Sequence, residues 1–171
     1  MIRERLTNGS RISPKSVAPS SECRASFPNL KLNLDVKAQA GCVATANAIN
    51  ELRAFDRVLV SSFSRARRLA TLRLLADPVA TSASSIEVLA LWLSHCLFGV
   101  RFRAIAKNFD AIQIPRSFGP IRLDSPKFIS RARRAGLEVH FWTVNQPEVG
   151  ELLIELGATG IVSDRVDLFQ F

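Results

Sequence analysis

Several residue types are scarce in this chain of 171 residues. It contains no tyrosine, one methionine, two histidines and three cysteines. The cysteines are far apart and odd in number, so they form neither a Cys-x-x-Cys zinc motif nor an even disulfide framework. A reducing, cytoplasmic compartment is therefore expected. His95 and His140 have no ligand partner at metal-binding spacing, which argues against a zinc enzyme. Eight glycines and eight prolines exclude a collagen-like chain.

Long apolar runs are missing as well. No run reaches the roughly 18 residues needed to cross a bilayer, so no transmembrane segment is expected. The longest candidate extends from Ile86 to Val100, is interrupted by Glu87 and His95, and predicts a buried helix. The hydrophobic share of 47% and the charged share of 22% are ordinary for globular proteins and exclude wholesale disorder.

Positive charge is abundant. The net charge is +8, and arginine supplies most of it, with 18 arginines against 5 lysines. Such a balance favours an anionic partner such as nucleic acid or a phospholipid surface. The arginines, however, occur in small groups along the chain, a pattern typical of solvated outer helix faces, so no specific nucleic acid partner is expected. These groups are Arg65, Arg67, Arg68 and Arg73; Arg101 and Arg103; Arg131, Arg133 and Arg134.

The chain divides near residue 27. Residues 1–26 contain six serines and little apolar periodicity, which predicts a disordered tail or, alternatively, a mispredicted start. From residue 27 to 171 the pattern predicts strands at 32–36, 57–61, 79–81, 111–114, 137–142 and 160–162. Helices are predicted at 43–55, 64–75, 85–97, 125–135 and 147–156, with Ser64 and Ser125 as N-caps.

Alternating strands and helices indicate an α/β fold with parallel strands and crossover helices. An open doubly wound sheet would typically carry a glycine-rich phosphate-binding turn, and the sequence has none. A (β/α)8 barrel needs about 250 residues. Residues 27–171 therefore predict one domain that is an incomplete (β/α)8 TIM-type barrel, with parallel strands and outer helices.

Five short motifs follow one another at predicted strand ends. They are Phe27-Pro28, Asn33-Leu34-Asp35-Val36-Lys37, Ser61-Ser62-Phe63-Ser64, Trp142-Thr143-Val144-Asn145 and Gly160-Ile161-Val162-Ser163-Asp164-Arg165. In this order and spacing, residues 27–169 resemble the C-terminal two-thirds of a glycerophosphodiester phosphodiesterase. The resemblance implies a (β/α)8 barrel that uses a divalent cation, Ca²⁺ or Mg²⁺. Its reaction would convert a small-molecule glycerophosphodiester and water to an alcohol and glycerol 3-phosphate.

The strand around Asp35 agrees with that chemistry. Alternation places Asn33, Asp35 and Lys37 on one face, which in a barrel would point inward near the carboxyl end, where barrel enzymes hold their active sites. A carboxylate suits a hard cation, so Asp35 is the metal-ligand candidate. The Lys37 ammonium can stabilise charge on a phosphoryl oxygen and is the catalytic candidate. An ordinary ion pair between the two is the alternative.

Two aromatic residues are substrate-binding candidates by resemblance. Trp142 would wall the pocket against the glycerol moiety, and Phe63 would line the pocket mouth. Core packing is the alternative for both rings. His140 shares a face with Trp142 but lies two residues deeper, which favours a packing role.

The family's remaining motifs are absent from the sequence. It contains no His-Arg, no Glu-x-Asp and no His-Asp, so the acid–base histidines and most metal ligands are missing. We therefore expect an incomplete metal site and a truncated chain with weak or no activity. Open sheet edges would permit a homo-oligomer. The alternative functions are a basic binding protein for an anionic partner and a decayed gene product.

Overall fold

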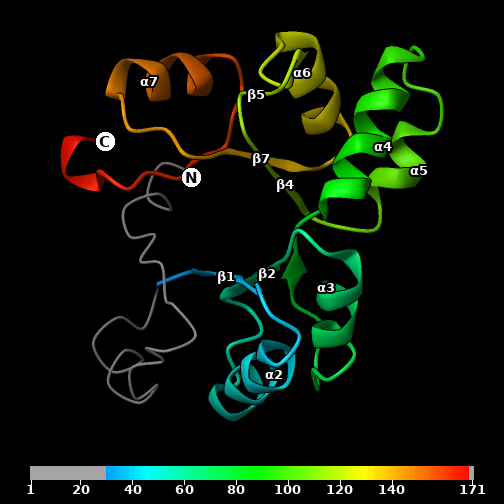
Figure 1. The fold of residues 1–171 in the computed structure, drawn as a ribbon, viewed down its shortest axis with the longest axis vertical. Helices are drawn as coiled ribbons and strands as arrows, with labels where there is room; N and C mark the ends of the chain where they lie inside the picture. The colour runs from blue at the N-terminus through cyan, green and yellow to red at the C-terminus, as the bar shows by residue number, and fades with distance from the viewer. Residues whose placement is uncertain (1–29, 170–171) are drawn as a thin grey trace.

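The computed structural model describes residues 30–169, which contain two groups of three parallel strands (Figure 1). The first group has the order β1-β2-β3 and the second the order β4-β7-β8. Every predicted strand is present, and the parallel direction is confirmed. The bounds are β1 Leu32–Asp35, β2 Val58–Ser61, β3 Ala80–Thr81, β4 Ala111–Ile114, β7 Glu138–Phe141 and β8 Gly160–Ile161.

Backbone contacts join the two groups of strands. Ser82 and Ala111 form a parallel bridge, and the Ala83 amide donates to the Ala111 carbonyl at 2.8 Å. The Asp110 amide donates to the Thr81 carbonyl at the same distance. Within residues 30–169 no strand joins β8 to β1, so the barrel is not closed there. The expectation of an incomplete barrel is confirmed for the described part of the chain.

Five helices follow the strands along the chain and pack beside them. Figure 1 shows α2 and α3 near β1 and β2, and α6 and α7 near β4 and β7. The Ser64 hydroxyl accepts from the Arg67 amide at 3.4 Å, and the Ser125 hydroxyl from the Phe128 amide at 3.2 Å, so both predicted caps are confirmed. The bounds are α2 Gly41–Leu52, α3 Arg65–Leu72, α4 Ser85–Cys96, α6 Pro126–Arg134 and α7 Pro147–Glu155.

Several short elements were not predicted. They are helix α5 (Phe102–Ala106), the antiparallel hairpin of β5 (Ser117–Phe118) and β6 (Ile121–Arg122), and the 3₁₀ turn η2 (Val166–Leu168). Predicted helix ends also shifted: α2 stops at Leu52 because Arg53 adopts a left-handed conformation with φ of 48°. Elements of two to five residues carry too little periodicity to be found from sequence.

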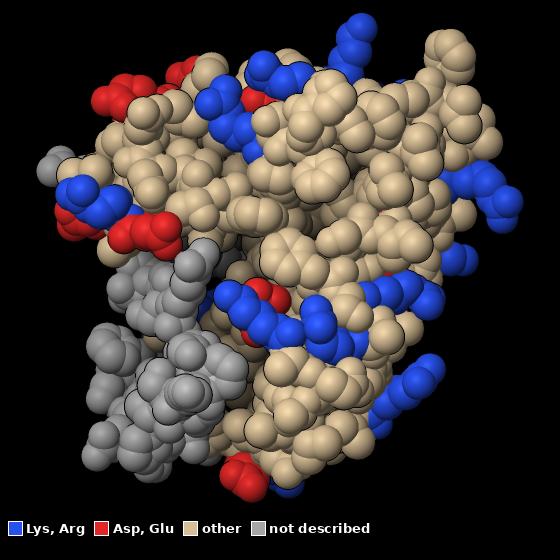
Figure 2. Space-filling model, viewed as in Figure 1, with Lys and Arg blue, Asp and Glu red and all other residues tan. Residues whose placement is uncertain are grey.

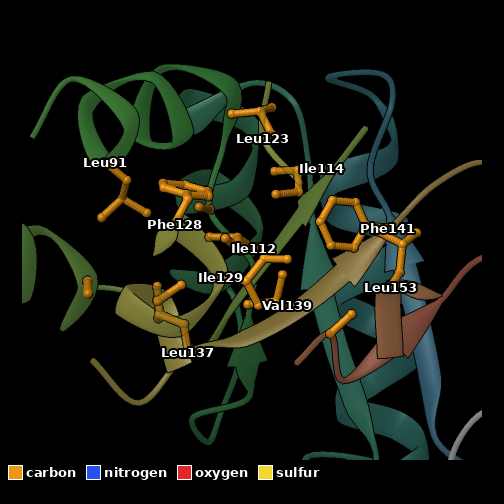
Figure 3. Packing of buried hydrophobic residues seen from close by; sticks show 14 of the residues in the cluster. Leu91, Ile112, Ile114, Leu123, Phe128, Ile129, Leu137, Val139, Phe141 and Leu153 are labelled. Atoms are coloured by element: carbon orange, nitrogen blue, oxygen red, sulfur yellow. The ribbon is translucent and has the colours of Figure 1, made fainter. Parts of the chain in front are cut away.

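The main apolar core lies between the second group of strands and the helices α4 to α7. Figure 3 shows Phe128 of α6 between Leu91 of α4 and Ile112 of β4, with Val139 and Phe141 of β7 nearby. A smaller cluster packs the first strands on α2 and α3. Its buried members are Val36, Cys42, Ile49, Ala54, Val58 and Val60.

The prediction of a buried helix over Ile86 to Val100 is wrong. Leu91 of α4 is fully buried, but Ile86 is 64% exposed and Phe98, which follows the helix, is 93% exposed. Only one face of α4 packs against the core, so its other apolar residues face solvent. The prediction of a solvated arginine face also fails at one position, because Arg68 is only 2% exposed.

Two further expectations concern the chain ends and membranes. The predicted tail at residues 1–26 lies outside the described residues. Across residues 30–169, none of the helices combines the length and the apolar character that crossing a bilayer requires.

Candidate active site

Asp35 and Lys37 lie at the carboxyl end of β1. Asp35 is the last residue of the strand, and Lys37 follows one buried residue, Val36, so both side chains share the polar face. Lys37 Nζ lies 4.0 Å from Asp35 Oδ2, and the two side chains are 61% and 34% exposed. The pair is therefore open to solvent and reachable by a small ligand.

The neighbouring strand fixes this strand end. The Ser61 hydroxyl at the end of β2 donates to Asn33 Oδ1 at 3.2 Å, on the face that carries Asp35. The Ser62 hydroxyl donates to the Val36 carbonyl at 2.7 Å. The second bond holds the backbone of β1 where the chain leaves the sheet, and the first joins the polar faces of β1 and β2. The serines of the Ser-Ser-Phe motif thus position the acidic and basic pair.

Phe63 and Trp142 meet at this same edge of the sheet. Phe63 lies two residues beyond β2, and Trp142 directly follows β7, so parallel strands bring both to the carboxyl edge. Their ring centroids are 5.6 Å apart at an interplanar angle of 70°, an edge-to-face contact. Phe63 is 54% exposed. The structure thus brings the two sequence-predicted aromatic residues together from different strand groups.

Below Trp142, the same face of the sheet carries a polar layer. His140 Nε2 lies 3.1 Å from Glu138 Oε2, and its Nδ1 lies 3.4 Å from Gln113 Nε2. A Cβ at Gly160 would come within 2.6 Å of the His140 ring, so only glycine fits beside it. His140 is therefore packed and hydrogen-bonded one layer deeper than Trp142, as its alternation along the strand predicted.

Sequence reasoning missed the partners of this layer. Glu138, His140 and Trp142 alternate along β7 on one face, so the alternation already contained the signal for Glu138. The contact with Gln113 depends on the register of β4 against β7, which pairs Gln113 with His140. That register is a tertiary property and leaves no mark in the local pattern.

Asn145 ties two loops together at the carboxyl edge. Its side-chain oxygen accepts from the Ser163 hydroxyl at 3.1 Å and from the Asp164 amide at 3.0 Å. It therefore links the segment after β7 to the segment after β8. Asn145 belongs to the quoted Trp-Thr-Val-Asn motif, but sequence reasoning gave it no role. The contact identifies it as a residue that positions the loop carrying Trp142.

A second missed group follows β4. The buried carboxylate of Asp124 accepts from Arg116 Nε at 3.1 Å and from Arg122 Nε at 2.8 Å. Burial raises the pKa of Asp124, but the hydrogen bonds and charges of the two arginines outweigh it and hold the pKa below its usual value. These bonds fasten the β5–β6 hairpin at the carboxyl edge.

The described residues do not form a complete cation site. Within residues 30–169 no group of three His, Cys, Asp or Glu side chains could hold a metal ion. Asp35 offers one carboxylate, with the Lys37 ammonium beside it, whereas Ca²⁺ takes six to eight oxygen ligands and Mg²⁺ near-octahedral coordination. Among residues 30–169, a cation would therefore find only part of the ligands that it needs.

Comparisons with known proteins converge on one family. Residues 12–168 match the model of the glycerophosphoryl diester phosphodiesterase family. The chain is 34% identical over 158 residues to the probable glycerophosphodiester phosphodiesterase 2 of Mycobacterium tuberculosis. That match covers 91% of this chain and 60% of the relative, so the chain spans little more than half the relative's length.

Solved structures share the fold. A glycerophosphodiester phosphodiesterase from Agrobacterium tumefaciens superposes with a TM-score of 0.62 at 17% identity, over 88% of this chain and 60% of its own. A phosphodiesterase from Oleispira antarctica, solved in complex with the product sn-glycerol-3-phosphate, gives a TM-score of 0.53 at 18% identity. That match covers 81% of this chain and 53% of its own.

Proposed function

The chain belongs to the glycerophosphoryl diester phosphodiesterase family, and we propose that it carries the substrate-facing part of a glycerophosphodiester phosphodiesterase site. The proposed reaction is hydrolysis of a glycerophosphodiester to an alcohol and glycerol 3-phosphate. One observation carries the proposal. The Phe63–Trp142 aromatic contact and the Asp35–Lys37 pair, drawn from three strands, lie at the carboxyl edge of the parallel sheet, where barrel enzymes hold their chemistry.

Lys37 is proposed to bind and neutralise the phosphoryl group. Its side chain is 61% exposed, so the ammonium can leave the 4.0 Å contact with Asp35 and reach a bound phosphoryl oxygen. Negative charge grows on those oxygens during phosphodiester cleavage, and a positioned cation stabilises it. Asp35 would then orient the ammonium in the absence of substrate and provide one oxygen ligand for a cation.

Phe63 and Trp142 are proposed to form the wall that receives the glycerol moiety. Their edge-to-face arrangement leaves the exposed Phe63 ring beside the Trp142 indole, a surface suited to the CH groups of glycerol. The hydrogen bonds of Asn145 to the loop after β8 would hold the segment that carries Trp142.

A divalent cation, Ca²⁺ or Mg²⁺, remains part of the proposal. When bound, such an ion supplies charge neutralisation at the phosphoryl oxygens. Because Asp35 is one carboxylate beside a lysine, a tight site would need ligands from outside residues 30–169. Calorimetric titration of the chain with Ca²⁺ is expected to show binding no tighter than the millimolar range typical of the weakest protein sites.

Little or no hydrolysis of glycerophosphocholine is expected from residues 1–171 alone with either cation. The leaving alkoxide needs a proton donor, and His140 lies one layer below Trp142 in contact with Glu138. Supplying a segment with the family's His-Arg-Gly, Glu-x-Asp and His-Asp motifs should switch hydrolysis on, and Lys37→Ala should then remove most of it. Robust turnover by the chain alone, abolished by Asp35→Ala, would contradict this assignment.

Product binding tests the proposal without requiring turnover. Titration with sn-glycerol 3-phosphate should give saturable binding that Lys37→Gln weakens by about ten- to a hundredfold, since a hydrogen bond to a charged group contributes about 1.5–3 kcal/mol. Lys31→Gln, at the opposite end of β1, is the matched control and should have no effect. If both variants lost the same affinity for sn-glycerol 3-phosphate, the loss would be explained by net charge, and the proposed role of Lys37 would be refuted.

The aromatic wall has its own control. Phe63→Ala should weaken binding of sn-glycerol 3-phosphate severalfold, whereas Phe98→Ala should leave it unchanged, because Phe98 follows the carboxyl end of helix α4 and is 93% exposed. A Phe63 variant that binds normally would leave the ring as a packing partner of Trp142 alone.

We further propose that the chain forms a homo-oligomer and is located in the cytoplasm. A homo-oligomer would use the outer edges of β1 and β8, which have no paired strand among residues 30–169. Light scattering of the purified chain tests it. A cytoplasmic location is supported by the odd cysteine count and by the free Cys42 and Cys96, and fractionation of expressing cells tests that location.

A further inference from the structure

Helix α4 and the turn after it expose a continuous row of large apolar side chains, here called the apolar stripe. The first four members recur every three or four residues, so they lie on one helix face. In Figure 2 the surface over α4 is largely free of charge and is bordered by lysine and arginine side chains. The members and their exposures are Ile86 64%, Leu89 47%, Leu93 49%, Leu97 64%, Phe98 93% and Val100 63%.

The apolar stripe is not a seam left open for another barrel helix. On one flank α4 contacts α3 through the ion pair of Glu87 with Arg68. On the other flank it contacts α6, where the His95 and Phe128 rings lie 5.3 Å apart. Because both lateral neighbours of α4 are present, the stripe faces outward. Contiguous exposed apolar surface of this kind marks an interaction site.

The turn after α4 holds Phe98 outward. The Ser94 hydroxyl donates to the Val100 carbonyl at 2.5 Å, and the Gly99 amide donates to the Ser94 carbonyl at 2.7 Å. Phe98 itself has a φ of 57°, a left-handed conformation that is uncommon for a bulky residue. Phe98 thus has an unfavourable backbone conformation, although this conformation leaves its ring almost fully exposed.

The charges that border the stripe all have one sign. Between residues 88 and 109, and again between 125 and 137, the sequence contains no Asp or Glu. Glu87, the acid in α4, is bound by the buried Arg68. A groove of about 690 Å³ runs between the end of α4 and α6, with Phe98 on one side and Lys127, Arg131 and Arg134 on the other. Lys127, Arg131 and Arg134 line this groove, and Arg101 and Arg103 directly follow the turn in sequence.

Arg131 is held at this groove. Its Nη1 donates to the His95 carbonyl at 2.9 Å and lies 3.2 Å from His95 Nδ1. A Cβ at Gly99 would come within 2.9 Å of the guanidinium carbon, so the glycine leaves room for the arginine beside the turn. A fixed guanidinium next to an exposed phenyl ring combines a phosphate-binding group with an apolar anchor.

We propose that this face, consisting of the apolar stripe and its basic border, docks on an anionic phospholipid bilayer. The apolar side chains would enter the boundary between head groups and acyl chains, while the basic side chains contact lipid phosphates. Charge complementarity favours this occupant over a second copy, because a symmetric dimer through the face would bring two basic borders together. The proposal goes beyond the proposed hydrolase function and does not depend on it.

Vesicle sedimentation tests the proposal with the full chain. The chain should sediment with vesicles of equal parts phosphatidylcholine and phosphatidylglycerol, remain in solution with pure phosphatidylcholine, and be released by high salt. The double variant Leu97→Ser/Phe98→Ser should lose at least tenfold in vesicle affinity. Val43→Ser/Phe118→Ser, which changes exposed apolar residues of α2 and the hairpin, is the matched control and should bind normally.

Charge variants separate the basic border from net charge. Arg103→Gln/Lys127→Gln should lower vesicle affinity about fivefold for each residue, the effect of one basic side chain near an anionic membrane. Lys31→Gln/Arg73→Gln removes the same charge elsewhere and should lower it far less. Equal losses in both pairs, or equal binding to pure phosphatidylcholine, would overturn the proposal. So would a dimer in light scattering that Leu97→Ser/Phe98→Ser dissociates, because a second copy would then occupy the face.

Discussion

The two strand groups of this molecule differ in how much apolar core supports them. The group β4-β7-β8 packs on a large cluster that includes Phe102, Phe109, Phe128 and Phe141, all buried. The group β1-β2-β3 packs on a small cluster without a fully buried aromatic residue. Yet the first group carries Asp35, Lys37 and Phe63. The candidate site therefore draws most of its residues from the half with the smaller apolar core.

Specific contacts join the two halves. The backbone pairing at Ser82 and Ala111 continues the sheet across the junction, and the Thr81 amide donates to Asp110 Oδ2 at 2.8 Å. Arg68 of α3 binds both carboxylate oxygens of Glu87 in α4, at 2.7 and 2.9 Å. The comparison leads to a simple expectation: damage to the large core should unfold both halves, and damage to the small core should loosen only the first.

The largest effect is expected from Phe128→Ala. Phe128 is fully buried and contacts the rings of Phe102 and His95, so the loss should be about 3–5 kcal/mol in the free energy of unfolding. Ile49→Ala in the small core is the counterpart. Hydrogen exchange should show faster amides throughout the chain for Phe128→Ala, but mainly in β1, β2 and α2 for Ile49→Ala. If Ile49→Ala also accelerated exchange throughout the chain, the expected difference between the two halves would be refuted.

The junction should respond strongly to Arg68→Met. The Arg68 side chain is 2% exposed and its bidentate pair with Glu87 joins α3 to α4, so its removal should cost about 3 kcal/mol in urea unfolding. Arg65→Met is the matched control, since Arg65 contacts the same carboxylate at 3.2 Å but is 59% exposed. Its loss should stay below about 1 kcal/mol. Similar losses would show that burial does not distinguish the two arginines.

The helix caps offer a smaller matched pair. Ser64 caps α3 in the first half and Ser125 caps α6 in the second, each through one backbone amide. Replacing either with alanine should lower stability by about 1 kcal/mol in urea unfolding, and asparagine should restore most of it. Hydrogen exchange should then become faster mainly in the first half for Ser64→Ala, and throughout the chain for Ser125→Ala. If the effect of Ser64→Ala spread through the chain and that of Ser125→Ala stayed local, the second half would be the less stable one.

The smallest expected effect is acid destabilisation of the junction. Burial raises the pKa of Glu87, but hydrogen bonds from Ser84 and the charge of Arg68 outweigh it, so the folded pKa lies below the ordinary value. The contact is therefore fully present above the ordinary carboxyl pKa of about 4.3 and is lost as pH falls through the folded value. Thermal unfolding of Glu87→Gln should depend less on pH in this range. The pKa of Asp124 is also lowered, so the Glu87→Gln variant should still lose some stability as the pH falls.

Much of the fold was predictable because it depends on local patterns. The alternation of Leu32, Leu34 and Val36 predicts a strand with a polar face, and Ser125-Pro126 predicts the start of α6; both are confirmed. The strand ends at Asp35, Phe63 and Trp142 also predict a common edge, because parallel strands share their carboxyl ends. The catalytic and binding roles of these residues stay predictions.

The error at α4 has a physical cause. A helix that is apolar on most sides is expected to be buried. Only packing decides which sides are covered. Helices α3, α5 and α6 contact α4 but leave Ile86 and Leu93 outside. The sequence contains the apolar residues of the stripe, but it does not determine that their side chains are exposed.

By itself, then, the sequence determined the strand–helix order, the caps and the alternation that puts Asp35 and Lys37 on one strand face. These features depend on neighbours within a few residues along the chain. The tertiary structure alone decided the Phe63–Trp142 contact, the His140–Gln113 register and the burial of Arg68 beside Glu87. Each joins residues far apart in sequence, because strand register and helix packing depend on the whole sheet and leave no local pattern to read.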